Sequence, residues 1–131
     1  MAWIQLITVL SLAQFLYFAL QVARARGRYG VKAPATTGHE LFERHYRVQM
    51  NSLELLIMLL PALWIAATLV RPLWPALLGG VYLLGRLLYA RSYVRDPARR
   101  ELGYSLSVLP IVVLLIIDAV GALVSLRAGG P

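Results

Sequence analysis

The sequence predicts an all-α integral membrane protein, in which each subunit is a bundle of four membrane-spanning helices. Three observations favour this fold class: 60% of the 131 residues are hydrophobic, the mean hydropathy is +0.69, and the apolar residues gather in four long runs. A soluble domain is typically about 45–50% apolar. Because a chain of this size forms one domain, residues 1–131 are expected to be a single transmembrane domain.

Each of the four apolar runs is expected to form a spanning helix. Such a helix needs about 20 apolar residues, and the runs 2–23, 48–70 and 104–126 supply them. The run 76–90 is shorter, but Arg86 can stretch its guanidinium toward the interface and tyrosines follow it, so this helix is expected to reach about Arg95. None of the runs alternates apolar and polar residues as a half-buried strand does.

The three connections between these helices are expected to differ. Residues 24–47 predict a long loop, because they contain the helix-breaking residues Gly27, Gly30, Pro34 and Gly38. Residues 71–75 predict a tight, proline-bounded turn. Asp96 is expected to cap a helix that begins at Pro97, since aspartate suits the N-cap and proline the first helical position.

Basic residues collect on one side of the predicted membrane. The first and third connections with their flanks carry Arg24, Arg26, Arg28, Lys32, Arg44, Arg47, Arg91, Arg95, Arg99 and Arg100. The other side has only Arg71 and Arg127. The positive-inside rule therefore places both basic connections in the cytoplasm and both termini outside. The compact chain without a retention signal favours a bacterial inner membrane over the endoplasmic reticulum.

Composition argues against several kinds of site and partner. The chain has no cysteine and only two histidines, so we expect no disulfide framework and no metal. The formal net charge of +7 and the pI near 10.4 indicate anionic lipid head groups or an anionic ligand as partners, rather than nucleic acid.

Polar residues inside the predicted spans are the candidate functional residues, because a charge at mid-bilayer costs about 2.5–3.5 kcal/mol on insertion scales. One helix face carries, at the spacing i, i+4 and i+7, Arg47, Asn51 and Glu54. Another carries, at i, i+3 and i+7, Arg86, Tyr89 and Tyr93. The predicted topology turns both faces toward the cytoplasmic leaflet, beside the segments that contain Arg26 and Arg100.

Two interpretations of these polar faces stay open at this point. Glu54 can form an interhelical ion pair with Arg86 or Arg47 that holds the bundle together. Alternatively, the surplus of guanidinium groups over carboxylates binds an anionic ligand, since arginine suits carboxylates and Glu54 suits an ammonium group. Asp118, deep in the fourth apolar run, fits neither interpretation.

The polar faces belong to a longer motif. Residues 43–54 read Glu-Arg-x-x-Arg-x-x-x-Asn-x-x-Glu, residues 80–89 read Gly-Val-Tyr-Leu-Leu-Gly-Arg-Leu-Leu-Tyr, and Tyr93 and Arg100 follow. This ordered set resembles the MAPEG family, membrane proteins of eicosanoid and glutathione metabolism. It is most similar to the leukotriene-synthase and microsomal glutathione transferase branch, from about Leu20 to Ser107.

The resemblance implies a homotrimer of four-helix subunits, with glutathione bound as co-substrate between neighbouring subunits. It implies that Arg100 is the catalytic residue that stabilises the glutathione thiolate, although Arg99 beside it is a competitor for that role. The family's glutathione-binding positions match Arg26, Arg47, Gln49, Asn51, Glu54, Arg86, Tyr89 and Tyr93. Leu55 and Ala19 depart from the branch, which has tyrosine and serine there, so the tyrosine's binding contact is expected to be absent.

The function implied by the resemblance is that of a membrane-bound glutathione transferase. A thiol with a pKa of about 8.5 or more needs help to ionise at neutral pH, and a guanidinium can stabilise the anion without itself titrating. A lipophilic electrophile would arrive through the membrane lipid, and the same thiolate would reduce lipid hydroperoxides. The alternatives are a non-catalytic, lipid-binding member of the family and a small four-helix multidrug exporter, although such exporters carry a carboxylate in the first helix and this chain has no acid before Arg24.

Overall fold

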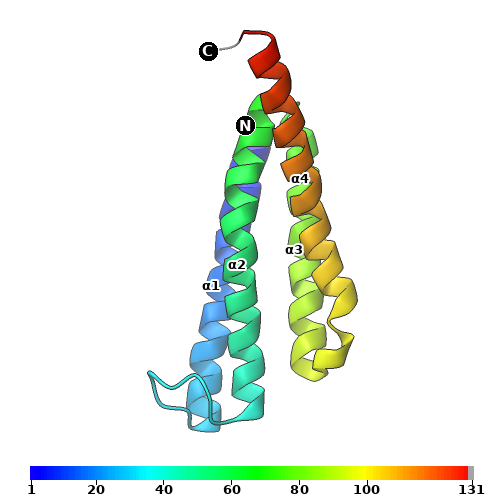
Figure 1. The fold of residues 1–131 in the computed structure, drawn as a ribbon. Helices are drawn as coiled ribbons and strands as arrows, with labels where there is room; N and C mark the ends of the chain where they lie inside the picture. Colours follow the sequence, from blue (N-terminus) through cyan, green and yellow to red (C-terminus); the bar gives the residue numbers. More distant parts are fainter. Residues whose placement is uncertain (130–131) are drawn as a thin grey trace.

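The computed structural model describes residues 1–129, which fold into four long α-helices and one short 3-10 helix (Figure 1). The elements are α1 (Ala2–Tyr29), α2 (Glu40–Leu69), α3 (Leu73–Arg95), η1 (Pro97–Arg99) and α4 (Glu101–Arg127). The described residues contain no strand. All four α-helices are long and apolar enough to cross a membrane, which confirms the predicted all-α, four-helix membrane fold.

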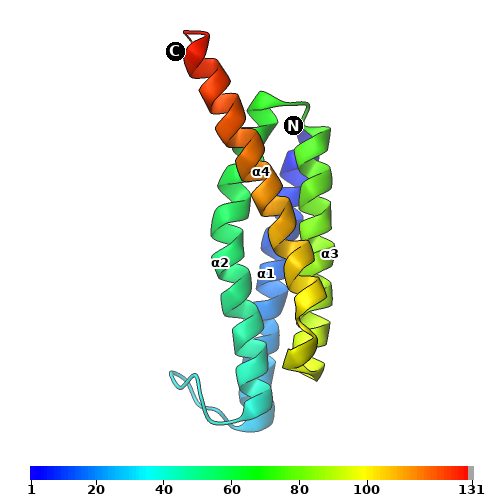
Figure 2. The ribbon, with the colours of Figure 1, turned by 45° about the vertical axis from the view of Figure 1, so that its right-hand side comes forward.

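The four helices stand side by side as one bundle, with α1 against α2 and α3 against α4 (Figure 1). Turning the molecule shows α4 lying between α2 and α3 (Figure 2). The N-terminus and the end of α4 lie at one end of the bundle, which we name the terminal end. The loop of residues 30–39 and η1 lie at the opposite end, which we name the basic end because both arginine-rich connections are at that end.

Apolar side chains fill the bundle toward the terminal end and also cover its outside. The buried cluster includes Ile4, Leu59, Leu63, Ala66 and Leu114. Large side chains that point outward, such as Leu16, Ile57 and Leu84, are equally apolar. Helices that are apolar on every side are typical of membrane spans, where hydrocarbon replaces water around the protein.

Two glycines allow α3 and α4 to lie in direct contact. A Cβ added to Gly85 would lie 2.7 Å from the carbonyl carbon of Leu106 and from the nitrogen of Ser107, both in the backbone of α4. Gly103 of α4 likewise lies against the backbone of Tyr89. Such close approach at small residues is the usual basis of helix packing in membranes, because lipid offers no hydrophobic force between helices.

The helices extend beyond the predicted bounds at the basic end. α1 continues through Gly27 to Tyr29, and α2 begins at Glu40 rather than at residue 48, so the expected loop over residues 24–47 is wrong in length. Gly30, at φ 70°, ends α1, and the Nδ1 atom of His39 accepts a hydrogen bond from the N–H of Leu41 at 3.1 Å to start α2. An apolar run marks only the part of a helix inside the hydrocarbon, so it does not show these polar extensions.

The other two connections are closer to expectation. The turn before α3 is shorter than predicted, because α3 already begins at Leu73. The predicted cap is confirmed: the Oδ1 atom of Asp96 accepts a hydrogen bond from the N–H of Ala98 at 3.1 Å. The helix that begins at Pro97 is the short η1, and α4 begins separately at Glu101.

Candidate functional site

Arg86 is the centre of a buried polar network in the middle of the bundle. Its side chain is 0% exposed. Its Nε atom donates to the Ser107 hydroxyl at 2.9 Å, and its Nη1 atom donates to the Asn51 Oδ1 atom at 2.6 Å and to the Ser52 hydroxyl at 3.2 Å. The guanidinium carbon lies 4.2 Å from the centre of the Tyr89 ring. The network therefore joins α2, α3 and α4, and it holds the side chain of Asn51 in place.

No carboxylate belongs to this network. The ion pairs among residues 1–129 are Arg44 with Glu40, at 2.6 Å, and Arg99 with Asp96, at 3.8 Å. The interpretation in which Glu54 forms an ion pair with Arg86 or Arg47 is therefore wrong for the described residues. The direct contact of Arg86 with glutathione stays a prediction, and the structure shows this arginine as an interior residue that orders its neighbours.

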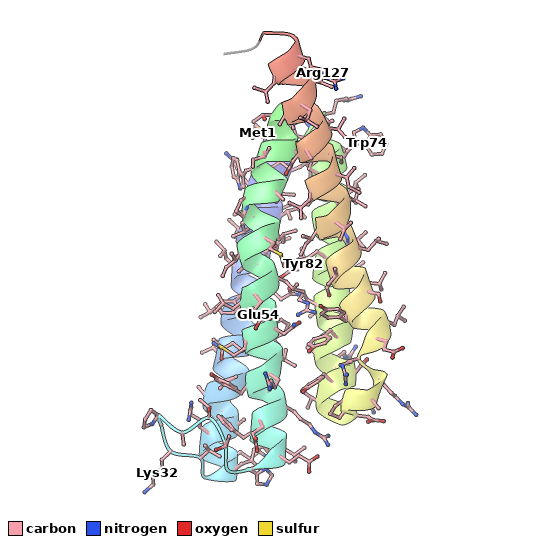
Figure 3. The ribbon with its side chains drawn as sticks, in the orientation of Figure 1. Met1, Lys32, Glu54, Trp74, Tyr82 and Arg127 are labelled. Carbon is pink, nitrogen blue, oxygen red and sulfur yellow. The ribbon has the colours of Figure 1, made fainter. Side chains whose placement is uncertain are left out.

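The remaining charged candidates lie on the outside of the subunit. Arg47, Glu54 and Arg100 are exposed, and Gln49, Asn51 and Tyr93 are half-buried. Figure 3 shows Glu54 on α2, between the level of Tyr82 and the loop that carries Lys32. The Nη1 atom of Arg100 donates to the carbonyl oxygen of Pro97 at 3.0 Å. These charges therefore face the surroundings of the subunit.

Tyrosines gather where α3 ends and α4 begins. Tyr89 and Tyr93 stack with their ring centres 5.4 Å apart, and Tyr104 lies 6.3 Å from Tyr89. Tyr93 also lines a small pocket of about 240 Å³ together with Arg47 and Arg44. The pocket contains Arg47 from one predicted polar face and Tyr93 from the other. The two faces therefore partly meet within one chain.

Arg26 lies apart from these residues. Its Nη1 atom donates to the carbonyl oxygen of Ala35 at 2.6 Å, and its guanidinium carbon lies 4.8 Å from the centre of the Phe42 ring. Arg26 thus packs on the loop between α1 and α2. Within a single chain, Arg26 is therefore not brought together with the residues around Tyr93 and Arg47.

The sequence analysis did not foresee the structural roles of three residues. Ser52 and Ser107 accept hydrogen bonds from Arg86, and Arg44 donates to the carbonyl oxygens of Val94 and Arg95 at 3.0 and 3.2 Å, which fastens the end of α3 to the start of α2. The position of the two serines within apolar runs could have indicated that they have a polar partner. Arg44 contacts backbone oxygens, and a pattern of side chains in the sequence does not reveal such a contact.

The two departures from the family pattern fit their surroundings. Leu55 is buried in the apolar core, so the side chain at this position serves packing. Ala19 is half-buried on α1. Among residues 1–129, no three His, Cys, Asp or Glu side chains are grouped so that they would hold a metal ion.

Comparison with known proteins adds independent findings. Residues 4–120 match the model of the MAPEG family. An uncharacterised protein of Synechocystis is 46% identical over 124 residues, which are 95% of this chain and 88% of the relative. Human microsomal glutathione S-transferase 2 is 37% identical over 115 residues, 88% of this chain and 78% of the relative. Bovine leukotriene C4 synthase is 37% identical over 117 residues, 89% of this chain and 78% of the relative.

Proposed function

The chain belongs to the MAPEG family and is an integral multi-pass membrane protein, and on this premise we propose that it is a glutathione transferase acting on a lipophilic electrophile. The proposal rests on the exposure and the missing ion-pair partners, within the described residues, of three charged side chains: Arg47, Glu54 and Arg100. All three are exposed and take part in no ion pair among residues 1–129. A charge within a membrane-spanning helix, such as that of Glu54, is expensive unless it has a partner, and the ammonium group of an ionic ligand supplies one.

The proposed site lies between the subunits of a homotrimer. Arg26 packs on the loop between α1 and α2, whereas Arg47 and Tyr93 line the pocket between α2 and α3. A single chain therefore does not assemble the whole set. A neighbouring subunit that contributes its own Arg26 would complete the site.

The charges of glutathione match the proposed residues. The peptide carries two carboxylates and one ammonium group at neutral pH. Arg26 and Arg47 would pair with the carboxylates, because guanidinium groups bind carboxylates with two parallel hydrogen bonds. Glu54 would accept hydrogen bonds from the ammonium group. Asn51, held by Arg86, would present its remaining amide hydrogen-bonding capacity to the peptide backbone.

The proposed chemistry requires an ionised sulfur. The thiol of a free cysteine has a pKa of about 8.5, and each unit of lowering needs about 1.4 kcal/mol of preferential anion stabilisation. A hydrogen bond from the Arg100 guanidinium to the sulfur would supply this, because charge-assisted bonds strengthen where water is excluded. The thiol proton leaves to water. The sulfur then forms a bond to the electrophilic carbon, and the leaving group departs with its electron pair.

Calorimetric titration of the purified chain with glutathione tests the proposal. We expect saturable binding by the wild-type protein and loss of that binding in Glu54→Gln, with Glu101→Gln as the control that removes a carboxylate at the start of α4. Absence of binding by the wild-type protein would instead support the non-catalytic, lipid-binding alternative. The exporter alternative is set aside, because the family match covers residues 4–120.

The proposal also concerns the chemical class of the second substrate and the membrane in which the protein lies. Conjugation of a chloronitrobenzene and reduction of an organic hydroperoxide, measured in parallel, would show how the thiolate divides between transferase and peroxidase chemistry. A relative from a cyanobacterium favours a bacterial inner membrane, with the basic end in the cytoplasm as the positive-inside rule requires.

A further inference from the structure

A groove opens on the side of the bundle formed by α1 and α3, at the basic end. Its volume is about 1270 Å³, which exceeds the roughly 300–1,000 Å³ of a typical small-molecule site. None of its lining residues belongs to α4, and none is among the proposed glutathione-binding residues. Near this end the α1–α2 pair stands apart from the α3–α4 pair (Figure 1). Apart from Arg99, the alternative to Arg100, the groove contains none of the residues assigned to the proposed active site.

The interior wall of the groove is apolar. It is formed by Phe18 of α1, Val48 of α2, and Leu87 and Leu88 of α3. Phe18 and Val48 are buried at its base, where they pack with Tyr89. A wall of this kind matches a hydrocarbon chain. The uncharged polar side chains of the lining are Tyr17, Gln21, His45 and Ser92.

The mouth of the groove is cationic. Arg91, Arg95 and Arg99 line it, and Asp96 is the one carboxylate among the lining residues. Asp96 lies 3.8 Å from Arg99. Arg91 and Arg95 are exposed and form no ion pair among residues 1–129. Two guanidinium groups at the mouth are therefore available to an anion.

The arginines and leucines of the groove lie at the membrane depths of a lipid's head group and acyl chains, respectively. Arg91 and Arg95 lie in the last turns of α3, at the end that the positive-inside rule assigns to the cytoplasmic leaflet. Leu87 and Leu88 lie about one turn deeper along the same helix. Basic pockets between spanning helices on the cytoplasmic side are suited to anionic head groups. Along α3, the arginines therefore lie at the depth of a phospholipid's phosphate, and the leucines lie at the depth of its acyl chains.

From this geometry we propose that the α1–α3 groove binds an anionic phospholipid of the inner leaflet. One acyl chain lies along Phe18, Leu87 and Leu88, and the phosphate accepts hydrogen bonds from Arg91 and Arg95. The two arginines select anionic over zwitterionic lipids, because a head group without net charge gains less from the guanidinium groups. The site requires only insertion in the membrane, so it stands independently of glutathione chemistry.

The test measures lipid binding by native mass spectrometry of the delipidated full-length protein. The probes are phosphatidylglycerol and phosphatidylcholine with identical acyl chains. We expect the wild-type protein to prefer phosphatidylglycerol, and the double variant Arg91→Gln with Arg95→Gln to lose that preference by roughly fivefold for each charge removed. The control, Arg71→Gln with Arg127→Gln, removes two arginines from the terminal end and should keep the preference.

A second variant examines the apolar wall. Ala90 lines the groove, and Ala90→Phe should weaken the binding of both lipids while leaving their ratio unchanged. Glycerol phosphate, which has the anion without the chains, should fail to compete with phosphatidylglycerol.

Any of three binding results would overturn the proposal: equal binding of both lipids by the wild-type protein, an unchanged preference in the double arginine variant, or full competition by glycerol phosphate. A change of oligomeric state in the double variant would show instead that another subunit covers the groove, and this result would also overturn it.

Discussion

The two ends of the bundle are held together by different interactions. Toward the terminal end, apolar side chains pack around Leu59, Leu63 and Leu114. Toward the basic end, the helices are joined by hydrogen bonds from Arg86 and Arg44 to side-chain and backbone oxygens. The comparison shows that hydrogen bonds from arginines to neutral oxygens take over from apolar packing between the helices.

Asp118 is the exception in the apolar half. It is 8% exposed in α4, and among the described residues neither of its carboxylate oxygens has a hydrogen-bond partner. Nothing in the described residues explains it. It therefore provides a direct way to ask whether the apolar half needs this carboxyl group.

The largest effect is expected from Arg86→Leu. This change removes three hydrogen bonds and leaves the oxygens of Asn51, Ser52 and Ser107 without their donor inside the bundle. We expect a loss of roughly 3 kcal/mol in unfolding free energy, together with weaker glutathione binding because Asn51 is released. Unfolding in detergent and calorimetry measure the two effects, and unchanged stability would contradict the structural role of the network.

Arg100→Ala should have the next largest effect, on rate rather than on stability. If the guanidinium lowers the pKa of the bound thiol by about two units from about 8.5, its removal decreases the thiolate fraction at pH 7 by roughly 25-fold. The ultraviolet absorbance of the thiolate and the conjugation rate should fall together. Arg99→Ala is the matched control, and a larger loss in that variant would transfer the catalytic role to Arg99.

Gly85→Ala tests the close contact of α3 with α4. The added methyl group meets the α4 backbone at 2.7 Å, and we expect a cost of about 2 kcal/mol in unfolding free energy. Gly80→Ala is the control in the same helix, because a Cβ there has no atom within 4 Å. That variant should be neutral or slightly stabilising, since alanine is the better helix former. Equal effects of the two changes would argue against a tight α3–α4 contact.

The smallest effect is expected from Asp118→Leu. Replacement of an unpartnered buried carboxyl by an apolar group of similar size removes its desolvation cost. We expect a gain of about 1 kcal/mol in unfolding free energy, measured in detergent. A clear loss of stability would show that Asp118 has a partner in the assembled protein.

The amino-acid sequence alone was sufficient for the membrane fold, the four spans, the gathering of basic residues at one end, the Asp96 cap and the family. These features depend on local properties: the transfer of an apolar run into lipid is nearly additive along the chain, and a cap involves neighbouring residues. The family motif is likewise read in order along the sequence.

The tertiary structure decided which helix faces meet. It buried Arg86 among hydroxyl groups and an amide, fastened Arg44 to the backbone of α3, separated Arg26 from the other candidate residues, and opened the groove between α1 and α3. These results depend on contacts between residues far apart in the chain. Helical spacing shows which residues share a face, but the partner of each face is set by how four helices pack together.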